Sequence, residues 1–159
     1  MIYLQLLFLI MVANGAPIIG RWLLNDHCST PLDGGMVFMD GLPVLGTSKT
    51  YRGVLCAILV TPLVAIFIGL TWDIGLTVSC LAMLGDCLSS FVKRRLNLPP
   101  SAMALGIDQI PESLLPLLGV WNQLSLGWDG IVATMAGFFI IELGLSAILY
   151  KLQIRKHPY

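Results

Sequence analysis

The chain has 159 residues, of which 57% are hydrophobic and only 11% are charged. Average soluble domains carry about 25% charged residues, so this composition excludes most soluble classes and indicates a protein with the bilayer as its solvent. The formal net charge is zero, so the composition predicts no attraction to nucleic acid. Any electrostatic function must come from where the charges are placed.

Five apolar segments are long enough to cross a hydrocarbon core of about 30 Å, which needs about 20 helical residues. We therefore expect an all-α integral membrane protein, forming one domain over residues 1–159, with spans at 2–19, 53–70, 74–91, 107–124 and 131–150. The fourth is the least apolar, since it contains Asp108, Glu112 and two prolines. No Lys or Arg precedes Arg21, so we interpret the first segment as a retained span and not as a secretory signal.

The basic residues are distributed very unevenly around these five segments. Three lie between the first and second segments, three between the third and fourth, and three after the fifth: Arg21, Lys49, Arg52, Lys93, Arg94, Arg95, Lys151, Arg155 and Lys156. The other two connections contain none. The positive-inside rule then places loops 21–52 and 92–106 and the C-terminus in the cytoplasm, and the N-terminus outside. The expected location is the cell (inner) membrane, with multiple crossings.

The first polar cluster lies just before the second span, at the end of a loop whose glycines and prolines predict ordered turns. Lys49, Thr50 and Arg52 stand between Gly46 and Gly53. Two cations, a hydroxyl and accessible backbone N–H groups at a helix N-terminus are suited to binding phosphate oxygens. A Walker A loop is absent. These cations would equally serve as a simple positive-inside anchor, and that alternative stays open.

The second polar cluster ends the third span. Asp86, Ser90, Lys93 and Arg94 are spaced i, i+4, i+7 and i+8, which places them on one face of a helix. An ionisable residue inside a span costs roughly 2.5–3.5 kcal/mol on insertion scales, which favours a functional role. A carboxylate followed by cations suits Mg²⁺ and the phosphates it bridges. The alternative is that Asp86 is neutralised by the cations of its own helix.

The third cluster, residues 108–112, opens the fourth span with Asp108 and Glu112. Because the preceding loop is short, Asp108 is expected to reach the same site as Asp86, and Mg²⁺ is commonly held by one or two carboxylates plus substrate phosphates. Alternatively, Asp108 is an N-cap and Glu112 only favours the helix dipole. Asp33 and Asp40 of the first loop have a weaker interpretation, either as part of a nucleotide site or as turn residues. Glu142 of the fifth span is interpreted as a partner within the bundle.

Taken together, these clusters predict a cytoplasm-facing site at the membrane boundary for Mg²⁺-assisted chemistry on a polyphosphate, with a lipid as co-substrate. Phosphoryl and nucleotidyl transfers need metal ions and cations to neutralise charge and align the attack. A non-catalytic transport subunit is the main alternative, but its carboxylates should line a path near the midplane. A lipid kinase or phosphatase is a second alternative, although neither a known nucleotide loop nor a His nucleophile is evident.

Several of these blocks, in this order, resemble the CDP-archaeol synthase family, membrane cytidylyltransferases related to the CDP-diacylglycerol synthases. The resemblance covers most of the chain. It is carried by Pro31-x-Asp33-x-Gly35, Asp40-Gly41, Gly46-x-x-Lys49-Thr50-x-Arg52-Gly53, Gly85-Asp86-x-x-x-Ser90-Phe91-x-Lys93-Arg94-Arg95 and Asp108-Gln109.

The resemblance implies transfer of a cytidylyl group from CTP to a lipid phosphate, with Mg²⁺ as cofactor. It implies that Asp86 and Asp108 are metal ligands. It also implies that Asp86, Lys93 and Asp108 are catalytic residues. It assigns substrate binding to Lys49, Thr50, Arg52, Ser90, Arg94 and Asp40.

The chain departs from the family pattern at Tyr51, where Trp is usual, and over residues 96–106 and 110–112. These departures leave the acceptor open between an ether-linked isoprenoid phosphate, a diacyl phosphatidate and another lipid phosphate.

Overall fold

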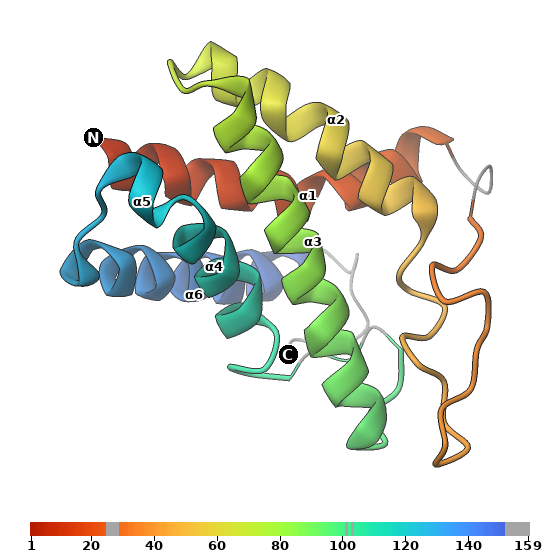
Figure 1. Cartoon of the computed structure of the whole chain (residues 1–159). Coiled ribbons are helices and arrows are strands. Elements are labelled where there is room, and N and C mark those ends of the chain that lie inside the picture. Colours follow the sequence, from red (N-terminus) through yellow and green to blue (C-terminus); the bar gives the residue numbers. More distant parts are fainter. Residues whose placement is uncertain (25–28, 101, 103, 152–159) are drawn as a thin grey trace.

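The computed structural model describes the backbone of residues 1–24, 29–100, 102 and 104–151, and side chains up to Ser146. Within these ranges the chain forms helices and no strand, apart from two isolated bridges, which confirms the predicted all-α class. Arg155 and Lys156 lie outside the described residues, as does the side chain of Lys151. The helices, labelled in Figure 1, are α1 (Ile2–Leu24), α2 (Tyr51–Phe67), α3 (Trp72–Arg95), α4 (Gln109–Gly119), α5 (Trp121–Leu124) and α6 (Trp128–Lys151).

The helices have the length and the surface of a membrane protein. Within the described residues, α1, α3 and the Trp128–Ser146 part of α6 are long and apolar enough to cross a bilayer. Helix α2 is a shorter apolar helix of 17 residues, about 25 Å long. Large apolar side chains such as Leu4, Leu59 and Ile140 lie exposed on the outer surface. An exposed apolar surface of this extent needs lipid as its solvent.

The predicted fourth span differs from the observed structure. Residues 107–124 form two helices, because α4 ends at Gly119 and α5 begins at Trp121. Pro116 lies in the last turn of α4 and lacks an N–H donor. The 11 residues of α4 extend only about 16 Å, too short to cross a bilayer alone.

Helices α1 and α3 extend beyond the predicted first and third spans. Helix α1 continues to Leu24 and α3 to Arg95. Arg21 is therefore a helical residue, although it was predicted to lie in a loop. The Lys93–Arg95 run continues α3, as the helical spacing from Asp86 to Arg94 predicts. The first loop agrees better with the prediction, since residues 29–50 contain turns and bends, with only isolated bridges.

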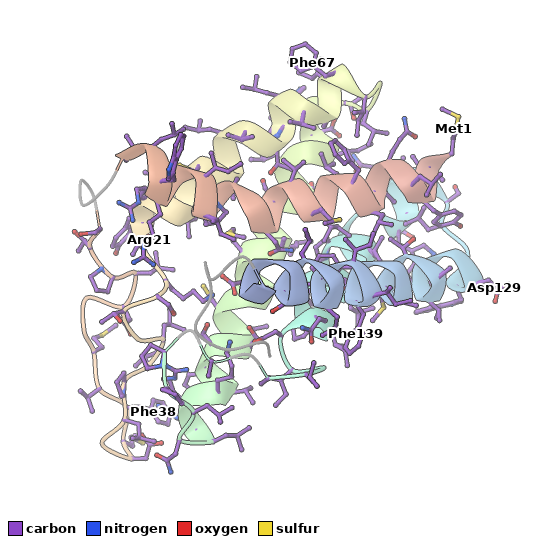
Figure 2. The ribbon with its side chains drawn as sticks, turned by 180° about the vertical axis from the view of Figure 1, so that it is seen from behind. Met1, Arg21, Phe38, Phe67, Asp129 and Phe139 are labelled. Atoms are coloured by element: carbon purple, nitrogen blue, oxygen red, sulfur yellow. The ribbon has the colours of Figure 1, made fainter. Side chains whose placement is uncertain are left out.

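Helix α3 crosses the others and packs against α1, α2 and α4, while α1 and α6 lie side by side (Figures 1 and 2). Gly75 lets α3 approach α2 closely, because a Cβ atom there would lie 2.5 Å from Pro62 Cα. Figure 2 shows Arg21 and Phe38 on one side of the molecule and Met1 and Asp129 on the opposite side. The loop and the basic end of α1 therefore share one side.

Candidate active site

The last three turns of α3 present a buried polar face. Ser90, Lys93 and Arg94 are each at most 6% exposed, and Asp86 lies on the same face one turn earlier. The stretch from Asp86 to Arg94 covers about 12 Å along the helix axis. Its partners come from the first loop and from the starts of α2 and α4.

Lys49, at the end of the first loop, forms an ion pair with Asp86. Burial lowers the pKa of Lys49, but the negative charges of Asp86 and Glu112 outweigh it, so the pKa lies above its ordinary value. Lys49 is therefore charged at neutral pH. The neighbouring Thr50 caps α2, since its Oγ1 accepts a hydrogen bond of 3.3 Å from the Gly53 N–H. Thr50, predicted as a substrate ligand, uses its hydroxyl for this cap.

Lys93 forms the second ion pair, with Asp108 at the start of α4. Lys93 Nζ lies 2.7 Å from Asp108 Oδ1 and donates a hydrogen bond of 3.0 Å to the Ala102 carbonyl. Asp108 Oδ2 accepts the N–H of Ala104, whereas Oδ1 has no partner in hydrogen-bond geometry. Asp86 is thus not neutralised by the cations of its own helix, because it pairs with a lysine of the first loop. Asp108 is not a side-chain cap, because it makes no capping hydrogen bond to α4. Both alternatives raised from the sequence are therefore wrong.

Arg94 is the most unusual cation of the site. Its guanidinium is buried, and Nη2 donates a hydrogen bond of 2.9 Å to the Pro99 carbonyl. Its Nε and Nη1 are buried without a hydrogen-bond partner among the described residues. The backbone of Gly46 approaches closely, since a Cβ atom there would lie 3.3 Å from Nη1. A buried cation with unused donors is costly unless an anion binds it. Arg52, in the first turn of α2, is also buried.

A third carboxylate joins Asp86. Glu112 of α4 is buried and lies close enough to Asp86, and to Glu142 of α6, to interact with both electrostatically. Gly85 makes this possible, because a Cβ atom there would lie 2.4 Å from the Pro111 carbonyl oxygen. Neither glutamate was among the predicted site residues. The available signal was their position: each is an ionisable residue inside an apolar segment.

Asp33 organises the first loop. Its carboxylate accepts three backbone N–H groups, from Gly35 at 3.0 Å, Leu45 at 2.8 Å and Gly46 at 3.0 Å. Burial raises the pKa of Asp33, but these hydrogen bonds outweigh it and hold the pKa below its ordinary value of 3.8. Asp33 therefore fixes the segment that lies against Arg94.

We expect Asp33→Ala to destabilise this loop by about 1–3 kcal/mol, because three N–H groups, of which that of Gly46 is buried, lose their acceptor. Since the folded pKa is the lower one, the carboxylate stabilises the loop above pH 3.8 and this contribution is lost as the pH falls through the folded value. Hydrogen exchange of residues 29–50 in detergent, at pH 7 and after acidification, measures both effects. Equal protection of Asp33→Ala and wild type at pH 7 would contradict this role.

Asp40, predicted as a substrate ligand, forms an ion pair with Arg95. The distance from Arg95 Nε to Asp40 Oδ2 is 3.0 Å, and Asp40 Oδ1 accepts the N–H of Leu42 at 3.1 Å. The Arg95 guanidinium also lies over the rings of Phe38 and Phe91, at 4.7 and 4.8 Å from their centroids. In Figure 2, Phe38 is accordingly seen beside the end of α3. Asp40 and Arg95 hold the loop to α3.

The carboxylates of the site suit Mg²⁺ when a phosphate ligand completes the coordination. No group of three His, Cys, Asp or Glu side chains in the described part of the chain has a metal-binding arrangement. Mg²⁺ needs none, because it commonly binds one or two carboxylates, waters and substrate phosphates. Asp86 and Asp108 supply hard oxygen ligands, and each carboxylate is held in place by an ion pair with a lysine. The donor set fits the ion.

Buried cations, hard carboxylates and helices long enough to cross a bilayer define a membrane protein with a site suited to phosphate chemistry. A family model described as CarS-like, CDP-archaeol synthase, matches residues 1–75 and 71–159. The chain therefore belongs to the CDP-archaeol synthase family, which confirms the resemblance seen in its motifs.

Curated relatives and a solved structure agree with this assignment. The chain is 33% identical to the CDP-archaeol synthase of Sulfurisphaera tokodaii over 94% of this chain and 90% of the relative. It is 42% identical to the CDP-archaeol synthase of Hyperthermus butylicus over 63% of this chain and 60% of the relative. A solved intramembrane enzyme for archaeal membrane lipid biosynthesis superposes with a TM-score of 0.75 at 27% identity, covering 89% of this chain and 90% of that one.

Proposed function

We propose that this enzyme transfers the cytidylyl group of CTP to a lipid phosphate, with Mg²⁺, and releases pyrophosphate. The observation that carries the proposal is Arg94, a buried cation with two unused donor nitrogens beside Lys93 and two carboxylates. A polyphosphate supplies the negative charge that these donors lack. Membership of the CDP-archaeol synthase family supports CTP as the donor of that polyphosphate.

In the proposed reaction, an oxygen of the lipid phosphate forms a bond to the α-phosphorus of CTP. The bond from this phosphorus to the oxygen bridging to the β-phosphorus breaks, and pyrophosphate leaves with the electron pair. Arg94 and Lys93 bind phosphate oxygens and stabilise the charge that builds up on them. Asp86 and Asp108 would hold Mg²⁺, and the ion would supply charge neutralisation at the phosphates. Lys49 holds Asp86 in position.

We also propose the membrane topology expected from the sequence, with five crossings, the N-terminus outside and the site facing the cytoplasm. Helices α4 and α5 together form the fourth crossing. The basic residues of α1, of the start of α2 and of the end of α3 support this orientation by the positive-inside rule. The same end of the molecule carries the ion pairs, which favours an enzyme site over a transport path through the midplane.

The acceptor is proposed to be an archaeol-type lipid phosphate, because the relatives are named CDP-archaeol synthases. Purified protein in detergent with CTP, Mg²⁺ and a panel of lipid phosphates tests this, with pyrophosphate release as the readout. We expect release with the ether-linked isoprenoid phosphate and less with diacyl phosphatidate. A folded protein that releases no pyrophosphate with any lipid would overturn the proposal.

Arg94→Lys is expected to raise the KM for CTP at least about tenfold, because it retains the charge but removes the planar donor set. The matched control is Arg21→Lys, which changes an exposed arginine at the end of α1. Initial rates at varied CTP measure both variants. If Arg94→Lys had the same KM as Arg21→Lys, Arg94 would not be the polyphosphate ligand.

A further inference from the structure

Arg95, the last residue of α3, is bound to the first loop. Its Nη2 donates hydrogen bonds to the carbonyls of Leu42 and Pro43, at 3.3 and 2.6 Å. Its Nε lies 3.0 Å from Asp40 Oδ2. One guanidinium therefore joins α3 to two backbone positions and one carboxylate of the loop. A planar fork of donors allows this geometry, and the single ammonium of a lysine does not.

Two aromatic rings complete this contact. Phe38 of the loop and Phe91 of α3 meet edge to face, with their ring centroids 5.3 Å apart. The Arg95 guanidinium lies over both rings, and a cation is attracted to an aromatic face. We call this set of four side chains the Arg95 clamp: Phe38, Asp40, Phe91 and Arg95.

Beyond the clamp, the loop runs back along α3 toward the middle of the helix, and Figure 1 shows the loop beside the end of α3. The contacts, in chain order, are Pro43 with Arg95, Gly46 with Arg94, and Lys49 with Asp86. Only two residues separate each loop residue from the next, and three residue steps extend at most about 11 Å. Movement of the loop at the clamp is therefore transmitted to Gly46 and Lys49.

We propose that Arg95 is a positioning residue, which holds the loop where Gly46 lies against Arg94 and Lys49 pairs with Asp86. The proposal rests on the proposed function and gives the last cation of the basic run a task different from phosphate binding. A loosened loop is in the binding-competent position for only part of the time. The apparent affinity for CTP falls by that fraction, whereas saturating CTP selects the competent position and restores turnover.

Direct binding of a phosphate by Arg95 is the competing explanation. Arg95 Nη1 is buried without a hydrogen-bond partner among the described residues, as are two nitrogens of Arg94. Removing Arg95 alone weakens CTP binding under either explanation. Phe38 separates the two, because a phenyl ring offers a phosphate neither a charge nor a hydrogen-bond donor, yet it belongs to the same clamp.

The test compares Arg95→Gln, Phe38→Ala and the double variant in purified full-length protein. The control for Phe38→Ala is Met39→Ala in the same loop, since the Met39 side chain is 98% exposed. The control for Arg95→Gln is Arg21→Gln, at an exposed position of α1. The measurements are KM and kcat for CTP, binding of CTP without lipid, and hydrogen exchange of residues 36–46.

Each single variant is expected to raise the KM and the dissociation constant for CTP about tenfold and to keep kcat within about threefold of wild type. Both should exchange faster over residues 36–46. The double variant should be no more than about twofold worse than the weaker-binding single variant, because both remove the same clamp. The two controls should match wild type.

Effects that multiply in the double variant, to about a hundredfold, would overturn the proposal and show that Arg95 binds the substrate itself. Faster exchange in Phe38→Ala with an unchanged KM would also overturn it, because the position of the loop would then not matter for CTP. A fall in kcat alone would indicate damage to the folded enzyme and would contradict it as well. If Arg95→Gln fails to fold, Arg95→Lys replaces it, since lysine retains the charge without the planar fork.

The exchange and binding measurements need no turnover, so the clamp and the proposed reaction fail separately. CTP binding that depends on the clamp, without transfer to any lipid, would refute the reaction alone. Transfer that proceeds with the same KM in the clamp variants would refute the clamp alone.

Discussion

Asp86→Asn is expected to lower the turnover number by about 10²–10³-fold or more, as is typical when charge stabilisation in a transition state is removed. The substitution retains the shape of the side chain but removes the charge that pairs with Lys49 and is proposed to hold Mg²⁺. Steady-state rates at saturating CTP, over a range of Mg²⁺ concentrations, measure the effect. The loss should persist at high Mg²⁺, because an amide is a poor ligand for this hard cation.

The matched control is Asp73→Asn, at the other end of the same helix. Asp73 Oδ2 accepts a hydrogen bond of 2.7 Å from Gln123 Nε2 at an exposed position. We expect its turnover to stay within about twofold of wild type, since exposed polar contacts contribute little. Wild-type turnover in Asp86→Asn, with both variants folded, would remove Asp86 from the site.

Gly85→Ala is the second substitution with a large expected effect. The added Cβ would lie 2.4 Å from the Pro111 carbonyl oxygen and 2.8 Å from the Glu112 nitrogen. Both are backbone atoms, so α4 must move away from α3. We expect a loss of about 1–3 kcal/mol in stability, typical of overpacking, together with a loss of turnover. The turnover falls because Asp108 and Glu112 move with α4.

Gly144→Ala is the control for this effect, because nothing lies within 4 Å of a Cβ atom at Gly144 in α6. Alanine favours a helix over glycine, so this variant should be as stable as wild type or more stable by about 0.5–1 kcal/mol. Thermal unfolding in detergent and turnover are measured for both variants. If the Gly85→Ala protein were as stable and active as Gly144→Ala, the close approach of α3 and α4 would not be needed for stability or turnover.

Much of the site could be read from local spacing. The helical period brings Asp86, Ser90, Lys93 and Arg94 to one face of α3, as the sequence predicts. The charge distribution also predicts that the polar clusters share one end of the bundle. These features depend on the repeat of a single helix and on the preference of basic residues for one side of the bilayer. Both can therefore be recognised in the sequence itself.

Contacts between elements could not be read in this way. The partner of Asp86 is Lys49 and that of Lys93 is Asp108, pairings that depend on how α3 crosses the first loop and α4. Glu112 reaches Asp86 because Gly85 has no side chain to keep α4 away. Such close approaches are set by packing in three dimensions, and a single sequence does not specify which glycine serves a contact.

The roles of Asp33 and Asp40 show the same difference between local features, which a sequence reveals, and contacts between elements, which it does not. Both were interpreted as turn or nucleotide residues of the loop, and both accept backbone N–H groups there. Only the structure distinguishes them, since Asp33 fixes the segment beside Arg94 while Asp40 pairs with Arg95. A turn residue is visible in a sequence, but the element on which the turn packs is not.

The most direct test of cytidylyl transfer follows the two ends of the triphosphate. Purified protein is given Mg²⁺, an archaeol-type lipid phosphate and CTP labelled either at the α-phosphorus or at the γ-phosphorus. The proposed reaction predicts that the α-label enters the lipid fraction and that the γ-label leaves as pyrophosphate. The γ-label in the lipid would indicate a kinase, and no label in the lipid from either CTP would contradict transfer altogether.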